Sequence, residues 1–451
     1  MTPDQIESAV AAAMPHSVEA LKRLAAIPSV AFPGHPEEPV RAAAAMTEEL
    51  LRGTGLQRVQ QIPVEGSFPA VYGEAPAPPG MPTVLLYAHY DVQPAGDLAA
   101  WRTPPFEPTL IDGQLFGRGV ADDKSGIIAH VTALRAFQGR FPVGIKVIIE
   151  GQEEYAGERL ESFVERNPDL LRADAVVVAD TGNPRVGDPA VTTSLRGMAA
   201  FTMEVRTLRE SVHSGSFGGA APDALAALMR MVTALHDDNG DIRVPGLPRG
   251  SFLGQGPAEE DFRNTAGVLD DVALIGSGSL ADRLWASYAL TVTGLDVSSV
   301  SGAVNAVQAV SRARITMRVP PAGDPKTAVN AVVDFLRQVA PWGVKVSFGD
   351  FTVGSGFQAD SGGMARSALN RAMERAFGRP PRDVGAGGSI PLVNTLLKQF
   401  PAAEILLFGA EDEDAAIHAP NERVDLEELR RVATAEALFL LELAEPSTPG
   451  S

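Results

Sequence analysis

Four short apolar runs rich in β-branched residues constrain the fold of this chain more than any other feature of its sequence. They are residues 84–87, 145–149, 175–178 and 405–408. Longer stretches with the apolar spacing of helices lie between them, notably residues 126–137, and another opens the chain at residues 5–25. Strands that alternate with helices predict a doubly wound, mostly parallel sheet that is buried on both faces. We therefore expect an α/β fold.

The middle of the chain follows a different pattern. Strands are expected at residues 198–205, 289–292, 314–319 and 344–348, and helices at 222–236 and 327–339. This βαββαβ order is the ferredoxin-like α+β pattern, and 451 residues exceed the usual size of one hydrophobic core. We predict an inserted domain at 194–352 and a discontinuous catalytic domain formed by 1–193 and 353–451. Residues 240–283, rich in glycine, proline and acidic residues, should form a long loop excursion within the insert.

Composition and charge exclude several classes of protein. The formal net charge of −18 argues against nucleic acid as a partner, because so negative a surface repels a phosphate backbone. The absence of cysteine excludes disulfides, thiolate zinc sites and cysteine nucleophiles, so any metal must be held by oxygen and imidazole nitrogen. No apolar run approaches the roughly 18 residues that span a bilayer, and the acidic N-terminal segment lacks a basic signal region. We expect a cytoplasmic protein without a membrane partner.

Acidic and histidine side chains follow each of the four predicted strands. They are His89 and Asp91 after the first, Glu150, Glu153 and Glu154 after the second, Asp180 after the third, and His418 in the loop after the last. In open α/β sheets ligands bind at the carboxyl ends of the strands. These side chains can therefore converge on one crevice.

The pair His89 and Asp91 is weak evidence for a metal site when it is considered by itself. Positions i and i+2 of an extended backbone project to the same side, and a metal-bound imidazole usually gives its other ring N–H to a carboxylate. A histidine at a strand end that bonds a local acid has the same sequence, however, and is the commoner case. The pair needs support from other ligands.

Residues 117–126 form a glycine-rich loop that runs into a predicted helix. The loop superficially resembles a phosphate-binding loop, but Asp123 stands where a glycine is expected before the Lys-Ser pair, and Asp122 and Asp123 would repel a phosphate. Two carboxylates in such a loop suit a cation better. An N-cap role for the following helix would explain one of the two aspartates but not both.

Five carboxylates would crowd the crevice, namely Asp91, Asp122, Glu153, Glu154 and Asp180. Such an arrangement is stable only with compensating positive charge, which two divalent cations would supply. With His89 and His418, these carboxylates form the ligand set expected for Zn²⁺, with Mn²⁺ or Co²⁺ as alternatives. The remaining histidines considered, His16, His35, His130 and His236, lack acidic clusters in the sequence and are expected to be structural or solvated.

Several motifs follow one another along the chain. They are His89-Tyr-Asp91-Val, Asp112-Gly-Gln-Leu-Phe-Gly-Arg-Gly119, Asp122-Asp123-Lys124, Glu150-Gly-Gln-Glu-Glu154, Val178-Ala-Asp180-Thr, His213-Ser-Gly215, Gly387-Gly-Ser-Ile-Pro391 and His418-Ala-Pro-Asn-Glu-Arg423. In this order they resemble the M20 family of metallopeptidases and deacylases, over about residues 15–445. The excursion at 240–283, followed by Arg283-Leu-Trp285, is similar to the dipeptidase branch of that family.

The resemblance implies a role for each residue of the crevice. His89, Asp122 and Asp180 would bind one metal ion, and Asp122, Glu154 and His418 would bind the other, so that Asp122 bridges two divalent ions. Glu153 would be the general base that deprotonates the attacking water and later protonates the leaving amine. Asp91 would orient His89. The family also has a non-proline cis peptide bond at the position of Asp122-Asp123.

The resemblance also implies that the inserted domain is a lid through which two chains form a homodimer. In dimeric members the histidine equivalent to His213 crosses from the partner subunit and stabilises the oxyanion of the tetrahedral intermediate. Asn305, Arg312, Gly388 and Ser389 are candidates for binding a substrate carboxylate. Residues 307–314 lack the Pro-x-Arg run of many members, so the motif does not identify which arginine would bind the carboxylate.

The function expected from these features is hydrolysis of the amide bond of dipeptides or short peptides. An N-acyl amino acid deacylase, acting on acetyl, succinyl or carbamoyl substrates, would use the same metal residues and differ in its pocket walls. A non-catalytic, metal-stabilised dimeric binding protein is the alternative from another class. It would need the ligands but no general base, whereas Glu153 is present.

Overall fold

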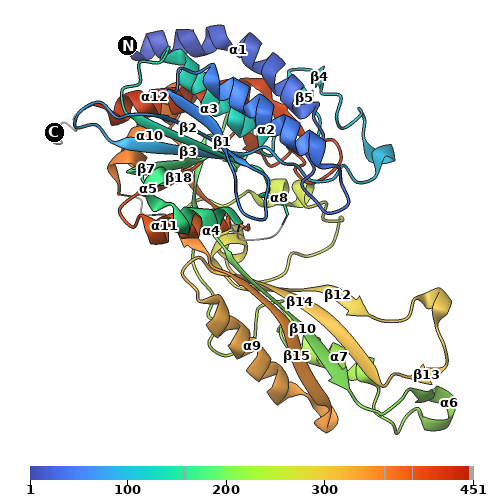
Figure 1. The fold of residues 1–451 in the computed structure, drawn as a ribbon. Helices are drawn as coiled ribbons and strands as arrows, with labels where there is room; N and C mark the ends of the chain where they lie inside the picture. Colours follow the sequence, from blue (N-terminus) through green and yellow to red (C-terminus); the bar gives the residue numbers. More distant parts are fainter. Residues whose placement is uncertain (156–158, 360–361, 389, 446–451) are drawn as a thin grey trace. The chain divides into compact units, whose positions relative to one another are not determined.

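The computed structural model describes residues 1–155, 159–359, 362–388 and 390–445. It divides the chain into two compact units (Figure 1). Unit 1 comprises Met1–Thr193, Ala359–Val384 and Leu392–Ser451, and unit 2 comprises Ser194–Gln358 and Gly385–Pro391. Unit 2 thus interrupts unit 1 in the sequence.

The main sheet is mixed, whereas the sequence predicted a mostly parallel one. Its strands are ordered β1 (Arg58–Ile62), β2 (Ala70–Ala75), β6 (Gly144–Glu150), β3 (Thr83–His89), β7 (Ala175–Val178), β18 (Glu404–Leu407) and β9 (Ala190–Leu195); β16 (Phe357–Gln358) and β17 (Arg382–Ala386) also pair with β9. The four predicted strands are β3, β6, β7 and β18, and they run parallel. β1, β2 and β9 are antiparallel to their neighbours. Antiparallel neighbours such as β1 and β2 can be joined by a short connection, which parallel neighbours cannot.

Helices cover both faces of this sheet (Figure 1). One side carries α1 (Pro3–Ala25), α2 (Glu37–Arg52), α3 (Lys124–Ala136), α10 (Met364–Phe377) and α12 (Leu426–Leu443). The other side carries α4 (Arg159–Arg166), α5 (Pro168–Leu171) and α11 (Pro391–Gln399). Alternate residues of β3, Val84, Leu86 and Ala88, share one apolar core with the first group of helices, as the two-residue period of a strand requires. The fold is therefore α/β, and α1 and α3 confirm the two helices predicted around its first strands.

Two short strand pairings place a C-terminal segment of unit 1 next to segments from the first half of the chain. β20 (Arg423–Asp425) pairs with β5 (Gln114–Phe116), which pairs with β4 (Thr109–Ile111). β19 (Glu411–Asp412) pairs in parallel with β8 (Gly182–Asn183). Residues 411–425 consequently lie beside the segments that follow β5 and β7.

Unit 2 contains a four-stranded antiparallel sheet with helices packed against it. In chain order its main elements are β10 (Gly197–Arg206), α7 (Ala224–Thr233), β12 (Ala289–Asp296), β14 (Val310–Val319), α9 (Pro325–Val339) and β15 (Lys345–Gly354), and the sheet order is β12-β14-β10-β15. Phe201, Met231, Ile315 and Val332 lie in its buried core. Residues 240–283 form the excursion between α7 and β12, and they include α8 (Glu259–Thr265). Among the described residues, no helix combines the length and apolarity needed to cross a bilayer.

Candidate metal centre

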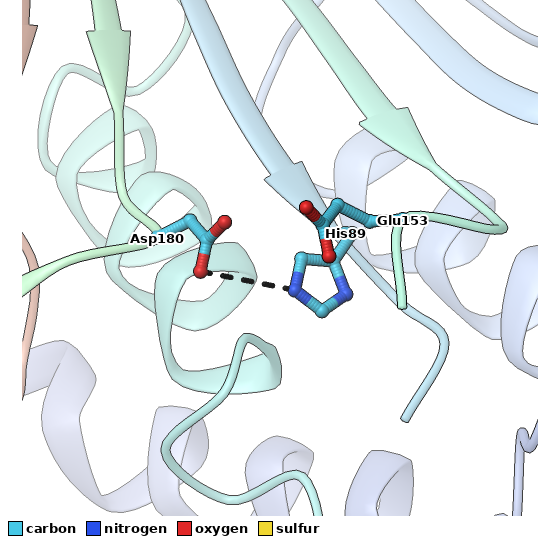
Figure 2. A group of neighbouring side chains, drawn as sticks. All are labelled: His89, Glu153 and Asp180. Atoms are coloured by element: carbon cyan, nitrogen blue, oxygen red, sulfur yellow. Dashed lines mark ion pairs between the residues drawn. The ribbon is translucent and has the colours of Figure 1, made fainter. Parts of the chain in front are cut away.

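Three adjacent parallel strands position several side chains of the site. β3 ends at His89, β6 ends at Glu150 and β7 ends at Val178, and His89 lies opposite Glu150 in the ladder. Because parallel strands end at the same edge of a sheet, the residues that follow them meet there. Figure 2 shows the side chains of His89, Glu153 and Asp180 grouped at this edge, with His89 Nε2 3.9 Å from Asp180 Oδ1.

Asp122 lies at the centre of the cluster. Its Oδ1 atom is 3.0 Å from Nε2 of His89, and its Oδ2 atom is 2.8 Å from Nε2 of His418. His418 Nε2 is also 3.0 Å from Oε2 of Glu154. Asp122 itself precedes α3, and its peptide bond to Asp123 is cis, as the resemblance implied.

Within the part of the chain that the structure describes, three groups of potential ligand atoms are close enough to hold a cation. Within each group the nitrogen or carboxylate oxygen atoms lie within 4.8 Å of one another. The groups are His89, Glu153 and Asp180; Asp122, Glu154 and His418; and Asp122, Asp180 and Glu411. Imidazole nitrogen and carboxylate oxygen are ligands of Zn²⁺, and carboxylates also suit Mn²⁺. The donor set therefore fits divalent cations.

Asp91 contacts both His89 and the loop that carries Glu153 and Glu154. Its Oδ1 atom is 3.3 Å from Nδ1 of His89, and its main-chain oxygen is 3.1 Å from the same nitrogen. The two carboxylate oxygens accept the backbone N–H groups of Glu153 and Glu154 at 3.0 and 3.1 Å. Asp91 thus fixes both the ring of His89 and the loop that carries the two glutamates.

Burial and crowding shift the protonation of these groups. Burial, followed by the charges of Asp91, Glu154 and Asp122, raises the pKa of Glu153 to about 7, although His89 opposes the shift. Hydrogen bonds to Asp122 and Glu154 raise the pKa of His418 to about 10. Without cations, protonated imidazoles and protonated carboxyls balance the excess negative charge. A bound cation would take over that task.

Some predicted participants lie outside the cluster. Glu150 is buried, and its Oε2 atom accepts a hydrogen bond from the Tyr87 hydroxyl at 2.8 Å. Asp123 is the N-cap residue of α3 but makes no side-chain capping bond; its Oδ2 atom accepts the backbone N–H of His89 at 3.1 Å. His130, which was expected to be structural or solvated, is buried, and its Nδ1 atom lies 2.8 Å from Glu436 Oε2, because α12 packs against α3.

Three side chains that the sequence did not single out also belong to the site. Gln93 Nε2 donates to Glu154 Oε2 at 2.8 Å. Glu422 accepts the backbone N–H groups of Gly119 and Ala121 at 2.9 and 3.0 Å. Glu411 follows β18 as the other acids follow their strands, so the same end-of-strand pattern was available to identify it.

His213, the candidate for oxyanion stabilisation, and the substrate-binding candidates belong to unit 2. The exposed His213 lies in the two-residue strand β11 (Val212–His213), and its Nδ1 atom accepts the backbone N–H of Gly215 at 3.1 Å. Asn305 and Gly388 are exposed, and Arg312 of β14 forms an ion pair with Glu204 of β10 at 2.7 Å. Ser389 lies outside the described residues. The roles assigned to these residues stay predictions.

Comparison with known proteins identifies the family. Residues 85–442 match the model of peptidase family M20/M25/M40. A cysteinylglycine-S-conjugate dipeptidase of Corynebacterium striatum is 40% identical over 412 residues, which cover 90% of each chain. A β-Ala-His dipeptidase of Rattus norvegicus is 28% identical, with 86% of this chain and 82% of that protein covered. The crystal structure of human carnosine dipeptidase 1 has a TM-score of 0.81 at 25% identity, covering 98% of this chain and 99% of that one. This chain therefore belongs to peptidase family M20/M25/M40 and is a metallopeptidase of the dipeptidase branch.

Proposed function

We propose that this protein is a two-metal dipeptidase that hydrolyses the amide bond of dipeptides or short peptides. The position of Asp122 carries the proposal, because its two carboxylate oxygens approach different imidazoles, those of His89 and His418. A carboxylate that faces two nitrogen ligands in this way is arranged to bridge two cations. One cation would be held by His89, Asp122 and Asp180, and the other by Asp122, Glu154 and His418. Zn²⁺ is the first candidate, with Mn²⁺ and Co²⁺ as alternatives.

The chemistry is divided between the cations and Glu153. Divalent cations bound here would polarise the scissile carbonyl and lower the pKa of a water molecule. Glu153 would take the proton of that water onto a carboxylate oxygen and later give it to the leaving amine. The position of Glu153 supports this role, because its carboxylate lies in one group with His89 and Asp180 and its backbone N–H is held by Asp91. Asp91 would keep His89 and the Glu153 loop in fixed positions relative to each other during the reaction.

The substrate class follows from the relatives. One relative is a cysteinylglycine-S-conjugate dipeptidase and another a β-Ala-His dipeptidase, so S-substituted Cys-Gly is the first substrate to test and β-Ala-His the second. The N-acyl amino acid deacylase remains the rival function, because it would use the same metal residues. A non-catalytic binding protein is excluded by membership of a dipeptidase branch.

We further propose that two chains associate through unit 2 and that His213 serves the partner's site. The edge position of β12 supports such an association, because Val292 and Leu295 are exposed on that strand. Exposure of His213 is compatible with a role in trans. Arg312 is already paired with Glu204, so a substrate carboxylate would have to compete for it.

Reconstitution tests the proposed function. Metal-free protein is reloaded with Zn²⁺, Mn²⁺ or Co²⁺ and assayed on S-substituted Cys-Gly, β-Ala-His, N-acetyl amino acids and N-succinyl amino acids. We expect two metal equivalents per chain by elemental analysis and turnover of dipeptides. Turnover confined to N-acyl substrates would establish the deacylase instead, and one equivalent per chain would contradict a bridging Asp122. Sedimentation of the same samples gives the oligomeric state.

A further inference from the structure

Glu411 reaches the metal centre through a close strand pairing. It lies in β19, which pairs in parallel with β8 so that Glu411 is opposite Gly182, two residues after Asp180. A Cβ atom at position 182 would lie 2.3 Å from the main-chain oxygen of Glu411. Glycine at this position therefore allows β19 to approach, and the approach brings the Glu411 side chain beside Asp180.

The carboxylate of Glu411 is buried beside two other acids, and none of the hydrogen bonds between described residues accounts for its position. Carboxylate oxygens of Glu411, Asp122 and Asp180 lie within 4.8 Å of one another. Glu411 is 8% exposed, and its Oε1 atom is buried without a hydrogen-bond partner among the residues that the structure describes. Its neighbour Asp412 is different, because Arg423 donates to both its oxygens at 2.7 and 2.9 Å.

Three carboxylates at this separation need positive charge between them. Burying an ionised carboxylate without a partner is costly, and two more beside it add repulsion. The described arginines of the neighbourhood are occupied, Arg423 by Asp412 and Arg118 by Glu422. A cation among the three oxygens satisfies all of them.

We propose that Glu411 is an additional ligand of the cation held between Asp122 and Asp180. The inference rests on the proposed function and enlarges its ligand set, because this cation would then have His89 and three carboxylates instead of His89 and two. A site so rich in oxygen favours a hard ion of higher coordination number, and Mn²⁺ gains more from the extra oxygen than Zn²⁺, for which four ligands suffice. Glu411 would therefore shift the selectivity of this position toward Mn²⁺.

Metal titration of the Glu411→Gln variant tests the proposal. Glutamine keeps the size of the side chain and removes its charge. We expect Mn²⁺ to bind one of the two positions at least about tenfold more weakly than in the wild type, since loss of even an outer-shell partner costs a metal site that much. The loss for Zn²⁺ should be smaller. Calorimetric titration of metal-free protein measures both, and Glu413→Gln, an exposed acid of the same loop, is the matched control.

Thermal unfolding provides a second measurement that separates a ligand from a structural residue. The melting temperature of metal-free Glu411→Gln should equal or exceed that of the wild type, because one of three crowded carboxylates is neutral. The increase in melting temperature on adding Mn²⁺ should be smaller for Glu411→Gln than for the wild type, because a bound ligand stabilises the folded state by an amount that increases with its affinity. Unchanged Mn²⁺ and Zn²⁺ affinities in Glu411→Gln would overturn the inference and leave the two-metal proposal intact. Wild-type protein that binds fewer than two ions would instead refute the proposed function.

Discussion

The guanidinium of Arg118 donates a hydrogen bond to Oε2 of Glu422 at 2.7 Å, and both side chains are almost wholly buried. The same carboxylate accepts the backbone N–H groups of Gly119, Ala121 and Asp122. One side chain from the segment that carries His418 therefore holds the loop that carries Asp122. The distance between His418 and Asp122 depends on a buried ion pair to which neither side chain belongs.

Loss of the Glu422 charge should destabilise the protein strongly. Glu422→Gln leaves the buried Arg118 without its counter-ion, and breaking a buried pair from one side costs about 3–5 kcal/mol. We expect a loss of this size in the free energy of unfolding, measured by denaturant titration. The double variant Arg118→Met, Glu422→Gln should lose less than the sum of the two single variants, because the pair acts as a unit. Strict additivity would contradict coupling between the two side chains.

Removal of the Asp91 carboxylate charge should weaken metal binding. In Asp91→Asn one oxygen becomes an NH₂ group, which cannot accept the backbone N–H of Glu153 or Glu154. Loss of such a supporting group typically lowers metal affinity 10–100-fold, and we expect a decrease of about that size. Calorimetric titration with Zn²⁺ measures it, and Glu107→Gln, at an exposed position, serves as the control. Equal affinity in the wild type and Asp91→Asn would show that Asp91 is dispensable.

Removal of Glu153 should separate catalysis from metal binding. If Glu153 carries the proton and is not a ligand, Glu153→Ala should lower kcat by at least about 10²–10⁴-fold, the usual contribution of a general base. The metal content should stay near two per chain. Steady-state turnover of S-substituted Cys-Gly and elemental analysis of the same preparation give both values. Full activity would refute the base role, and a drop to one ion would make Glu153 a ligand of the group it shares with His89 and Asp180.

The pair formed by His130 and Glu436 should make stability depend on pH. Burial alone lowers the pKa of His130, but the Glu436 carboxylate at 2.8 Å more than offsets it and holds the pKa above its ordinary value of 6.5. Because the folded state has the higher pKa, the stabilisation is complete below about 6.5 and is lost as the pH rises through the raised pKa. The loss in unfolding free energy caused by His130→Gln should therefore shrink as the pH rises above neutrality.

Denaturant titrations of the His130→Gln variant and wild type at a series of pH values measure this difference. His16→Gln, at an exposed position of α1, is the matched control for the loss of an imidazole. A difference for His130→Gln that stays constant or grows with pH would show that folding does not raise the pKa of His130.

The central strands were predictable because each is a short apolar run. Residues 84–87, 145–149 and 175–178 fall within β3, β6 and β7. The edge strand β1 was missed, because its sequence Arg-Val-Gln-Gln-Ile leaves most of its residues exposed and contains no such run. Edge strands are covered on fewer sides, so their sequences carry less of the apolar signal on which the prediction depends. The buried strands β2 and β9, which run antiparallel to β6 and β18, were also missed, so that only the parallel strands were predicted.

The sequence by itself determined the order of the elements. It also determined which acids and histidines stand at the strand ends, because apolar periodicity and turn residues depend only on neighbouring positions in the chain. It could not decide which of those side chains face one another. Glu150 and Glu411 both follow apolar strands, yet Glu150 bonds Tyr87 whereas Glu411 approaches Asp122 and Asp180. The difference depends on the pairing of β19 with β8, which joins segments that are distant in the sequence. Only the tertiary structure sets such pairings, since they depend on how the whole sheet packs.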